Sequence, residues 1–227
     1  MTKFISFDMD GTLINTEFTD WVWKHGIPTL YGQKYGTPFE AARAFVEEEY
    51  RKVGEGAVEW YDIKYWFRFF QLEIDWRGLM ERYVDKIDVY PDVRPILEAL
   101  NHEFSLILSS NAGREFIEIE MKATGLERYF DRFFSATSDF GNVKKTTSFY
   151  SQVCRVLGVH PHEIIHVGDH YEFDYLVPRE AGIHAFYLDR SGDKKGDDVL
   201  GDLRELGMRL PLLSNGCEGI GSRRPKF

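Results

Sequence analysis

Short apolar runs alternate with longer segments of helical period along most of this chain. Five of the runs have the length and composition of buried strands, at residues 4–7, 105–108, 133–136, 164–167 and 184–188. Between the later runs, apolar residues recur every three to four positions, as at Phe116, Ile119 and Ala123. Strands that alternate with helices predict an α/β fold, with a Rossmann-like parallel sheet core flanked by helices.

Residues 15–88 follow a different pattern, directly after the first expected strand. This segment contains no strand-like run and is rich in tryptophan, tyrosine and phenylalanine. Apolar residues of helical period predict one helix over 39–53, which we expect to begin with a capping box between Thr37 and Glu40. A second aromatic helix is expected from about residue 57 to residue 70. The segment is therefore interpreted as an all-helical insertion.

These patterns divide the chain into two units and a tail. We expect residues 1–14 and 89–210 to form the α/β core domain, and residues 15–88 to form a small helical cap domain. Residues 211–227 show little pattern and are expected to form a C-terminal tail. An insertion placed directly after the first strand lies where it can cover the end of the sheet at which ligands collect.

Composition excludes several classes of function. The chain has 227 residues, 43% of them hydrophobic, and a formal net charge of -9, which argues against nucleic acid or an anionic membrane as the main partner. Its two cysteines, Cys154 and Cys217, lie far apart and imply no disulfide framework. No apolar run approaches the roughly 18 residues of a membrane span, and the first residues lack a signal-peptide pattern. We therefore expect a soluble, cytoplasmic protein, and the sequence gives no indication of its oligomeric state.

Polar residues that can carry chemistry follow the ends of the expected strands. The first strand ends at Asp8 and Asp10, although ionised carboxylates are rarely buried without a partner. The later strand ends add a hydroxyl, an amide, an amine and two carboxylates: Ser110, Asn111, Lys144, Asp169 and Asp174. Because ligands of open parallel sheets bind at the carboxyl ends of the strands, we expect these groups to share one site.

Several carboxylates in one site need a cation between them. Two like charges about 4 Å apart repel by roughly 4 kcal/mol at an effective dielectric constant near 20. Oxygen ligands favour Mg²⁺, whereas zinc prefers histidine and cysteine. Lys144 adds a second positive charge beside the metal. The set predicts a phosphate group held between Mg²⁺ and a lysine.

The order of these motifs is similar to that of the haloacid dehalogenase superfamily. The first motif is Asp8-Met9-Asp10-Gly11-Thr12, the second is the strand that ends in Ser110-Asn111, and the fourth is Val167-Gly168-Asp169 followed by Asp174. The chain resembles the phosphatase branch that carries a helical cap after the first motif, as in phosphoglycolate phosphatase-like members. The resemblance covers nearly the whole chain to about Arg190.

The third motif of this family is a lysine that usually precedes proline, fourteen positions before a glycine. Counting back from Gly158 selects Lys144, while Lys145 stands where the family has proline and is the alternative. The resemblance implies that Lys144 binds the substrate phosphate together with Ser110 and Asn111.

For the two aspartates of the first motif, the resemblance implies separate tasks. Asp8 is expected to attack phosphorus and form an aspartyl-phosphate, and Asp10 to act as general acid and then as general base. Mg²⁺ is expected to bind Asp8, the backbone carbonyl of Asp10, and Asp169. Asp174 is expected to orient Lys144 or a metal-bound water from outside the metal's coordination sphere.

The resemblance and the site residues together predict a Mg²⁺-dependent phosphomonoester hydrolase acting on a small phosphorylated metabolite. Several other interpretations compete with this prediction. A phosphotransferase or phosphosugar mutase, or a non-catalytic phosphate-binding regulator, fits the same scaffold, whereas a dehalogenase has no use for Asp10. A calcium loop is disfavoured because Leu13 stands where an EF-hand needs glycine. A zinc site is suggested by four histidines, namely His160, His162, His166 and His170. We expect even His170, the one nearest the site, to have no catalytic or metal-binding role.

Overall fold

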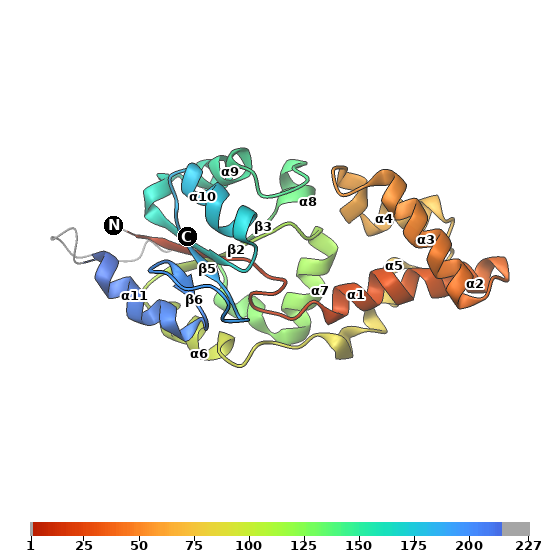
Figure 1. Ribbon diagram of the computed structural model, residues 1–227, viewed down its shortest axis with the longest axis horizontal. Coiled ribbons are helices and arrows are strands. Elements are labelled where there is room, and N and C mark those ends of the chain that lie inside the picture. Colours follow the sequence, from red (N-terminus) through yellow and green to blue (C-terminus); the bar gives the residue numbers. More distant parts are fainter. Residues whose placement is uncertain (1, 215–227) are drawn as a thin grey trace.

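One parallel sheet forms the centre of the protein (Figure 1). Within residues 2–214, which this computed structural model describes, the strand order is β3-β2-β1-β4-β5-β6. The strands are β1 (Phe4–Phe7), β2 (Ser105–Ser110), β3 (Arg132–Ser135), β4 (Ile164–Gly168), β5 (His184–Leu188) and β6 (Val199–Leu200). The α/β class and the parallel sheet predicted from the sequence are therefore confirmed, while the two-residue strand β6 was too short to show a pattern.

Helices cover both faces of the sheet, as a parallel sheet requires. One face packs against α6 (Val93–Leu100), α7 (Arg114–Thr124) and α11 (Arg204–Ser214) through fully buried residues such as Ile5 and Phe7 of β1. The other face packs against α9 (Thr147–Leu157), with α10 (Val177–Glu180) beside it. Because successive side chains of a strand point to opposite faces, Ser6 of β1 turns away from Ile5 and Phe7.

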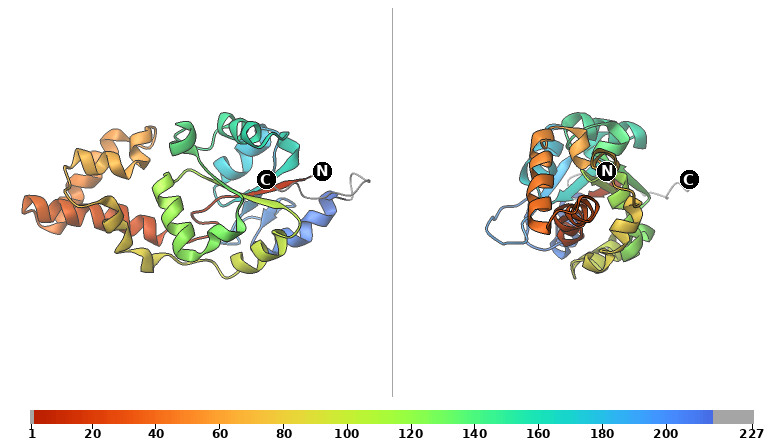
Figure 2. Two further views of the ribbon diagram at one scale, coloured as in Figure 1. Left: turned by 180° about the vertical axis from the view of Figure 1, so that it is seen from behind. Right: turned by 90° about the vertical axis from the view of Figure 1, so that its right-hand side faces the viewer.

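The named elements between β1 and α6 are all helical, and we call residues 17–86 the helical insertion. It consists of α1 (Glu17–Trp21), η1 (Val22–Gly26), α2 (Ile27–Tyr35), α3 (Phe39–Val53), η2 (Val58–Tyr61), α4 (Ile63–Phe69), α5 (Trp76–Glu81) and η3 (Val84–Lys86). The insertion projects beyond the carboxyl ends of the strands, and the view from behind shows it at the same end (Figures 1 and 2). A second apolar core, built around Phe18 and Trp66, holds these helices together.

Two details of the expected helices differ in the structure. The helix expected over 39–53 is α3, but its N-cap residue is Pro38 and no side chain caps it, so the expected capping box is wrong. The aromatic helix expected over 57–70 is divided at Asp62, whose side chain accepts a hydrogen bond from Lys64 N–H at 2.8 Å. This local bond favours an N-cap over an uninterrupted helix.

Two chain segments connect the helical insertion to the sheet. Asn15 N–H donates to Asp88 C=O at 2.9 Å, and Tyr90 N–H donates to Leu13 C=O at 3.2 Å. Ile14 also forms an antiparallel bridge with residue 89. The insertion thus enters and leaves through paired segments next to the end of β1.

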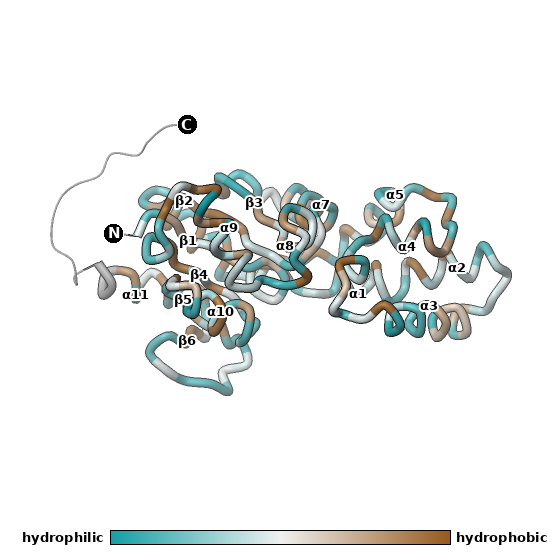
Figure 3. Tube along the Cα trace, turned by 90° about the horizontal axis from the view of Figure 1, so that it is seen from above, coloured by the Kyte–Doolittle hydropathy of each residue, from teal (hydrophilic) through white to brown (hydrophobic). Residues whose placement is uncertain are grey.

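Hydrophobic residues are frequent along the strands, and the loop between β5 and β6 is hydrophilic (Figure 3). Among the described residues, no helix combines the length and apolar character needed to cross a membrane.

Residues 211–214 of the expected tail continue α11, and residues 215–227 lie outside the described residues.

Candidate active site

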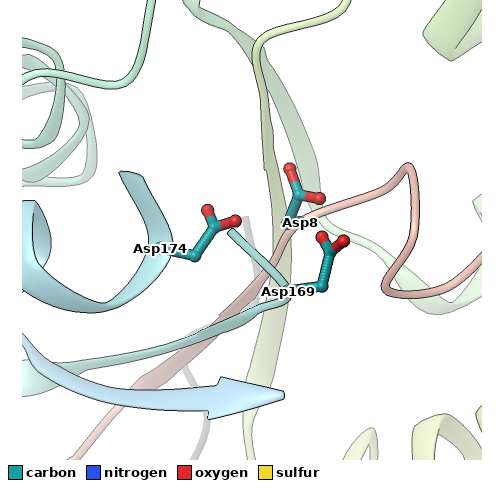
Figure 4. A group of neighbouring side chains, drawn as sticks. All are labelled: Asp8, Asp169 and Asp174. Atoms are coloured by element: carbon teal, nitrogen blue, oxygen red, sulfur yellow. The ribbon is translucent and has the colours of Figure 1, made fainter. Parts of the chain in front are cut away.

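Three carboxylates meet at the carboxyl end of the sheet. Asp8 follows β1, Asp169 follows β4, and Asp174 lies in the π-helical segment η6 (Tyr171–Leu176). One carboxylate oxygen from each lies within 4.8 Å of the others, and Figure 4 shows the three side chains gathered there. The structure therefore brings together three of the carboxylates that the sequence analysis assigned to one site.

Two glycines allow these carboxylates to approach the backbone. Gly11 has a φ of 80°, and a Cβ atom there would lie 2.2 Å from Asp169 Oδ2. A Cβ atom on Gly168 would lie 2.4 Å from Asp174 Cγ. Any larger residue at either position would displace a carboxylate of the site.

Thr12 joins the first and fourth motifs. Its hydroxyl accepts a hydrogen bond from Asp169 N–H at 3.0 Å and donates to Asp169 Oδ1 at 3.1 Å. The same Oγ1 lies 3.4 Å from Asp8 Oδ2. Thr12 therefore fixes Asp169 beside Asp8, a role that the sequence analysis did not assign, although Thr12 belongs to the first motif.

Lys145, and not Lys144, reaches the carboxylates. The ammonium group of Lys145 contacts Asp8 Oδ1 and lies 2.5 Å from Asp174 Oδ1, and the side chain is 1% exposed. Lys144 is 32% exposed and lies 3.7 Å from Glu55 of the helical insertion. The expected assignment of Lys144 to the site is therefore corrected to Lys145.

The hydrogen bonding of the loop explains this difference. Lys145 N–H donates to Asn111 Oδ1 at 2.8 Å, a bond that the proline of the family pattern could not make. Thr146 follows at once and caps α9 by accepting from Phe149 N–H at 3.3 Å. These two contacts fix residue 145 against the end of β2, so that its side chain enters the site.

The second motif supports the site in two ways. Ser110 is buried at the end of β2, and its Oγ accepts a hydrogen bond from Ala112 N–H at 3.0 Å, which leaves the hydroxyl proton available to a ligand. The side-chain oxygen of Asn111 is occupied by Lys145 N–H. The sequence analysis expected Asn111 to bind phosphate, and in the structure its side chain positions the loop that carries Lys145.

Burial dominates the electrostatics of the acidic residues. Burial, and next the charge of Asp169, raise the pKa of Asp10 to about 7. Burial also raises the pKa values of Asp8 and Asp169, and their neighbouring carboxylates add to the effect while Lys145 opposes it. One lysine does not balance this group of acids, so the site favours a further cation.

Asp174 differs from the other carboxylates because its oxygens already have donors. Oδ1 lies 2.5 Å from Lys145 Nζ and 2.9 Å from His166 Nε2, while Oδ2 accepts from His170 N–H at 3.0 Å. Burial opposes ionisation of Asp174, but the charge of Lys145 and the hydrogen bonds from His166 and Lys145 together outweigh it and lower the pKa well below its usual range. Asp174 is therefore a fully bonded partner of Lys145.

The remaining oxygen donors fit a hard divalent cation. Asp8 and Asp169 offer carboxylate oxygens to such a cation. Asp10 Oδ1 is buried beside them with no hydrogen-bond partner among the described residues, so it is free for another task. Oxygen-only ligands in a site with excess negative charge suit Mg²⁺. His170 is not one of these oxygen donors, and its Nδ1 accepts a hydrogen bond from Phe173 N–H at 3.3 Å that caps η6.

Comparisons with known proteins agree with this geometry. A family model described as haloacid dehalogenase-like hydrolase matches residues 2–182. GMP/IMP nucleotidase YrfG of Escherichia coli is 26% identical over 166 residues, which cover 73% of this chain and 73% of the relative. Pyrophosphatase PpaX of Halalkalibacterium halodurans is 27% identical over 184 residues, which cover 79% and 80%. The crystal structure of an HAD phosphatase from Thermococcus onnurineus has a TM-score of 0.78 at 28% identity and covers 92% of this chain and 98% of that one.

Proposed function

The chain belongs to the haloacid dehalogenase-like hydrolase family and is a phosphatase, and we propose that it is a cytoplasmic, Mg²⁺-dependent phosphomonoesterase acting on a small phosphorylated metabolite. The observation that carries this proposal is the meeting of Asp8, Asp169 and Lys145 at one end of the sheet. A nucleophile, an acidic metal site and a buried ammonium group there match the needs of phosphoryl transfer.

Asp8 is the proposed nucleophile. Its carboxylate attacks phosphorus, the bond to the leaving alcohol breaks, and an aspartyl-phosphate forms. Lys145 contacts Oδ1 of Asp8, and Thr12 Oγ1 lies 3.4 Å from Oδ2, so contacts to both oxygens fix the orientation of the carboxylate. This orientation restricts the carboxylate to one approach toward the phosphoryl group.

Asp10 is the proposed proton carrier. A pKa of about 7 lets this carboxyl group hold a proton at neutral pH and release it when the leaving alcohol needs one. The resulting carboxylate then takes a proton from the water that hydrolyses the aspartyl-phosphate. Oδ1 of Asp10 has no partner among the described residues, which leaves it available to the leaving group or to that water.

Two further groups support the phosphoryl oxygens. Ser110 offers its hydroxyl proton, and Lys145 offers the positive charge that the sequence analysis assigned to its neighbour. Mg²⁺, held by Asp8, Asp169 and the carbonyl of Asp10, would neutralise charge between nucleophile and phosphate. The helical insertion is the proposed cap, whose position at this end of the sheet favours small substrates over folded phosphoproteins.

A phosphate-release assay tests the proposal. Nucleoside monophosphates are tested first, because one relative is a GMP/IMP nucleotidase, followed by sugar phosphates and phosphoglycolate. We expect Mg²⁺-dependent release of inorganic phosphate from at least one ester, and none from the Asp8→Asn variant. Transfer of phosphate to an added alcohol or sugar in preference to water would favour the phosphotransferase alternative. Binding of esters without turnover would favour the regulator.

A further inference from the structure

A chain of buried polar side chains crosses the sheet behind the acidic site. It joins Ser109 of β2, Ser6 of β1 and His166 of β4, each at most 1% exposed. The two serine hydroxyls lie 2.9 Å apart, and His166 Nδ1 lies 2.9 Å from Ser6 Oγ. The other ring nitrogen, Nε2, lies 2.9 Å from Asp174 Oδ1, so the chain ends in the site.

The direction of the last hydrogen bond follows from its partners. An ionised carboxylate only accepts hydrogen bonds, so His166 carries a proton on Nε2 and donates it to Asp174. Burial lowers the pKa of His166, which keeps the ring neutral and leaves Nδ1 as an acceptor. His166 is therefore a donor to Asp174, and Ser6 Oγ lies 2.9 Å from its other ring nitrogen.

Asp174 Oδ1 receives two donors at once. Lys145 Nζ lies 2.5 Å from this oxygen, which also accepts from His166. The three N–H groups of Lys145 have three protein acceptors, namely Asp8 Oδ1, Asp174 Oδ1 and Ser109 C=O at 3.2 Å. An ammonium group has no fourth donor, so Lys145 must release one acceptor before it can bind a phosphoryl oxygen.

Release of Asp174 by Lys145 would remove a donor from a fully buried carboxylate. Such a group is strongly destabilised when it has no partner. His166, the second donor to Oδ1, limits this penalty, while His170 N–H stays on Oδ2. Of the two carboxylates, Asp8 is the poorer one to release, because its orientation toward the substrate depends on Lys145.

We propose that His166 is a positioning residue that keeps Oδ1 of Asp174 hydrogen-bonded while Lys145 turns from this oxygen toward the transferring phosphoryl group. This inference rests on the proposed phosphatase reaction. His166 acts through Asp174 and does not touch the substrate itself. Its effect therefore belongs to the transfer step and is expected in kcat more than in KM.

A pair of amide variants separates this role from core packing. In His166→Gln the amide nitrogen can occupy the place of Nε2 and donate to Asp174, whereas in His166→Asn it can reach only toward Ser6. We expect His166→Gln to keep kcat within about threefold of wild type, and His166→Asn to lose roughly tenfold or more, with KM nearly unchanged. Thermal unfolding of both variants controls for folding. Equal losses in both, or a loss confined to KM, would overturn the proposal.

A spectroscopic measurement distinguishes failure of this inference from failure of the proposed function. The His166 Nε2–H resonance is followed by NMR in the wild-type protein as inorganic phosphate and Mg²⁺ are added. We expect it to shift, because Lys145 leaves the shared oxygen, and we expect no such shift in Lys145→Met. A wild-type protein that hydrolyses esters without this shift would retain the function and refute the inference. A shift without hydrolysis of any ester would support the inference and refute the function.

Discussion

Lys145 and Asp174 form a buried ion pair, with Nζ 2.5 Å from Oδ1 and the two side chains 1% and 0% exposed. The adjacent Lys144 points instead to Glu55 of the helical insertion. Two neighbouring lysines thus have different tasks, one inside the acidic site and one at the boundary with the insertion. The distinction rests on the bond from Lys145 N–H to Asn111, which fixes the register of the loop.

This division predicts unequal effects of the two lysines. Lys145→Met should lower kcat by roughly 10²-fold or more, because Asp8 loses the group that orients it and the phosphoryl group loses a donor. It should also lower the free energy of unfolding by about 3–5 kcal/mol, since Asp174 keeps its charge without an ion-pair partner. Lys144→Met is the matched control and should keep kcat within about threefold. Steady-state kinetics and urea unfolding measure both effects, and a greater loss in Lys144→Met would restore the original assignment.

Glu120 of α7 predicts a pH-dependent change in stability. The side chain is fully buried, and neither carboxylate oxygen has a hydrogen-bond partner among the described residues. Burial, and then the charge of Asp10, raise its pKa well above the usual value. An acid whose pKa is raised on folding has no effect below its unfolded pKa, and it destabilises the protein as the pH rises above that value.

Glu120→Gln should therefore raise the free energy of unfolding by about 1–3 kcal/mol at pH 7. The difference from wild type should disappear below about pH 4, where Glu120 is protonated in both the folded and the unfolded protein. Denaturant unfolding from pH 4 to pH 8 measures this, with Glu118→Gln as an exposed control on the same helix. A constant difference across this range would show that the charge of Glu120 is not its cause.

An ion pair between α4 and α7 predicts coupling between the helical insertion and the α/β unit. Lys64 contacts Glu115, with side chains 46% and 14% exposed. Lys64→Glu should weaken this contact between the helical insertion and the α/β unit. Because partly exposed ion pairs contribute less than about 1 kcal/mol, we expect KM to rise only a few-fold. Adding Glu115→Lys restores opposite charges and should return KM toward the wild-type value. Kinetics of the two single variants and the double variant complete the cycle, and additive effects would argue against the pairing.

Metal removal should abolish activity. Burial and neighbouring carboxylates raise the pKa values of Asp8 and Asp169 although Lys145 opposes this, so the ionised site needs a further cation, and without metal it should bind phosphate esters poorly. EDTA should therefore stop phosphate release, and Mg²⁺ should restore it better than Ca²⁺, which prefers looser and higher coordination. Full activity in metal-free buffer would exclude this mechanism.

Local patterns predicted the sheet well because strand and helix periods are local properties of the sequence. The bounds expected for the first and last of the five strands are those of β1 and β5. The paired aspartates were found for the same reason, since they directly follow β1. The division at Asp62 was missed because one side-chain hydrogen bond to the backbone overrides the aromatic periodicity on either side.

Contacts between distant segments were less predictable. The lysine was misassigned by one position, because the deciding bond joins Lys145 to Asn111 across two loops. His166 looked like an ordinary strand residue, and only the pairing of β4 with β1 places it beside Ser6. The cap role of the helical insertion and the domain boundaries remain predictions.

The central claim is that Asp8 carries the phosphoryl group and Asp10 carries the proton. Asp10→Asn keeps the nucleophile but should lower the overall rate by about 10²–10⁴-fold. With an aryl phosphate, whose leaving group needs no proton, formation of the aspartyl-phosphate should be affected less than its hydrolysis. Mass spectrometry of Asp10→Asn, quenched during turnover, should therefore find a phosphate on Asp8 in the peptide of residues 4–17, and none in Asp8→Asn. Phosphate on Asp10 in Asp8→Asn would reverse the two roles, and a peptide free of phosphate in wild type and both variants would contradict the covalent mechanism.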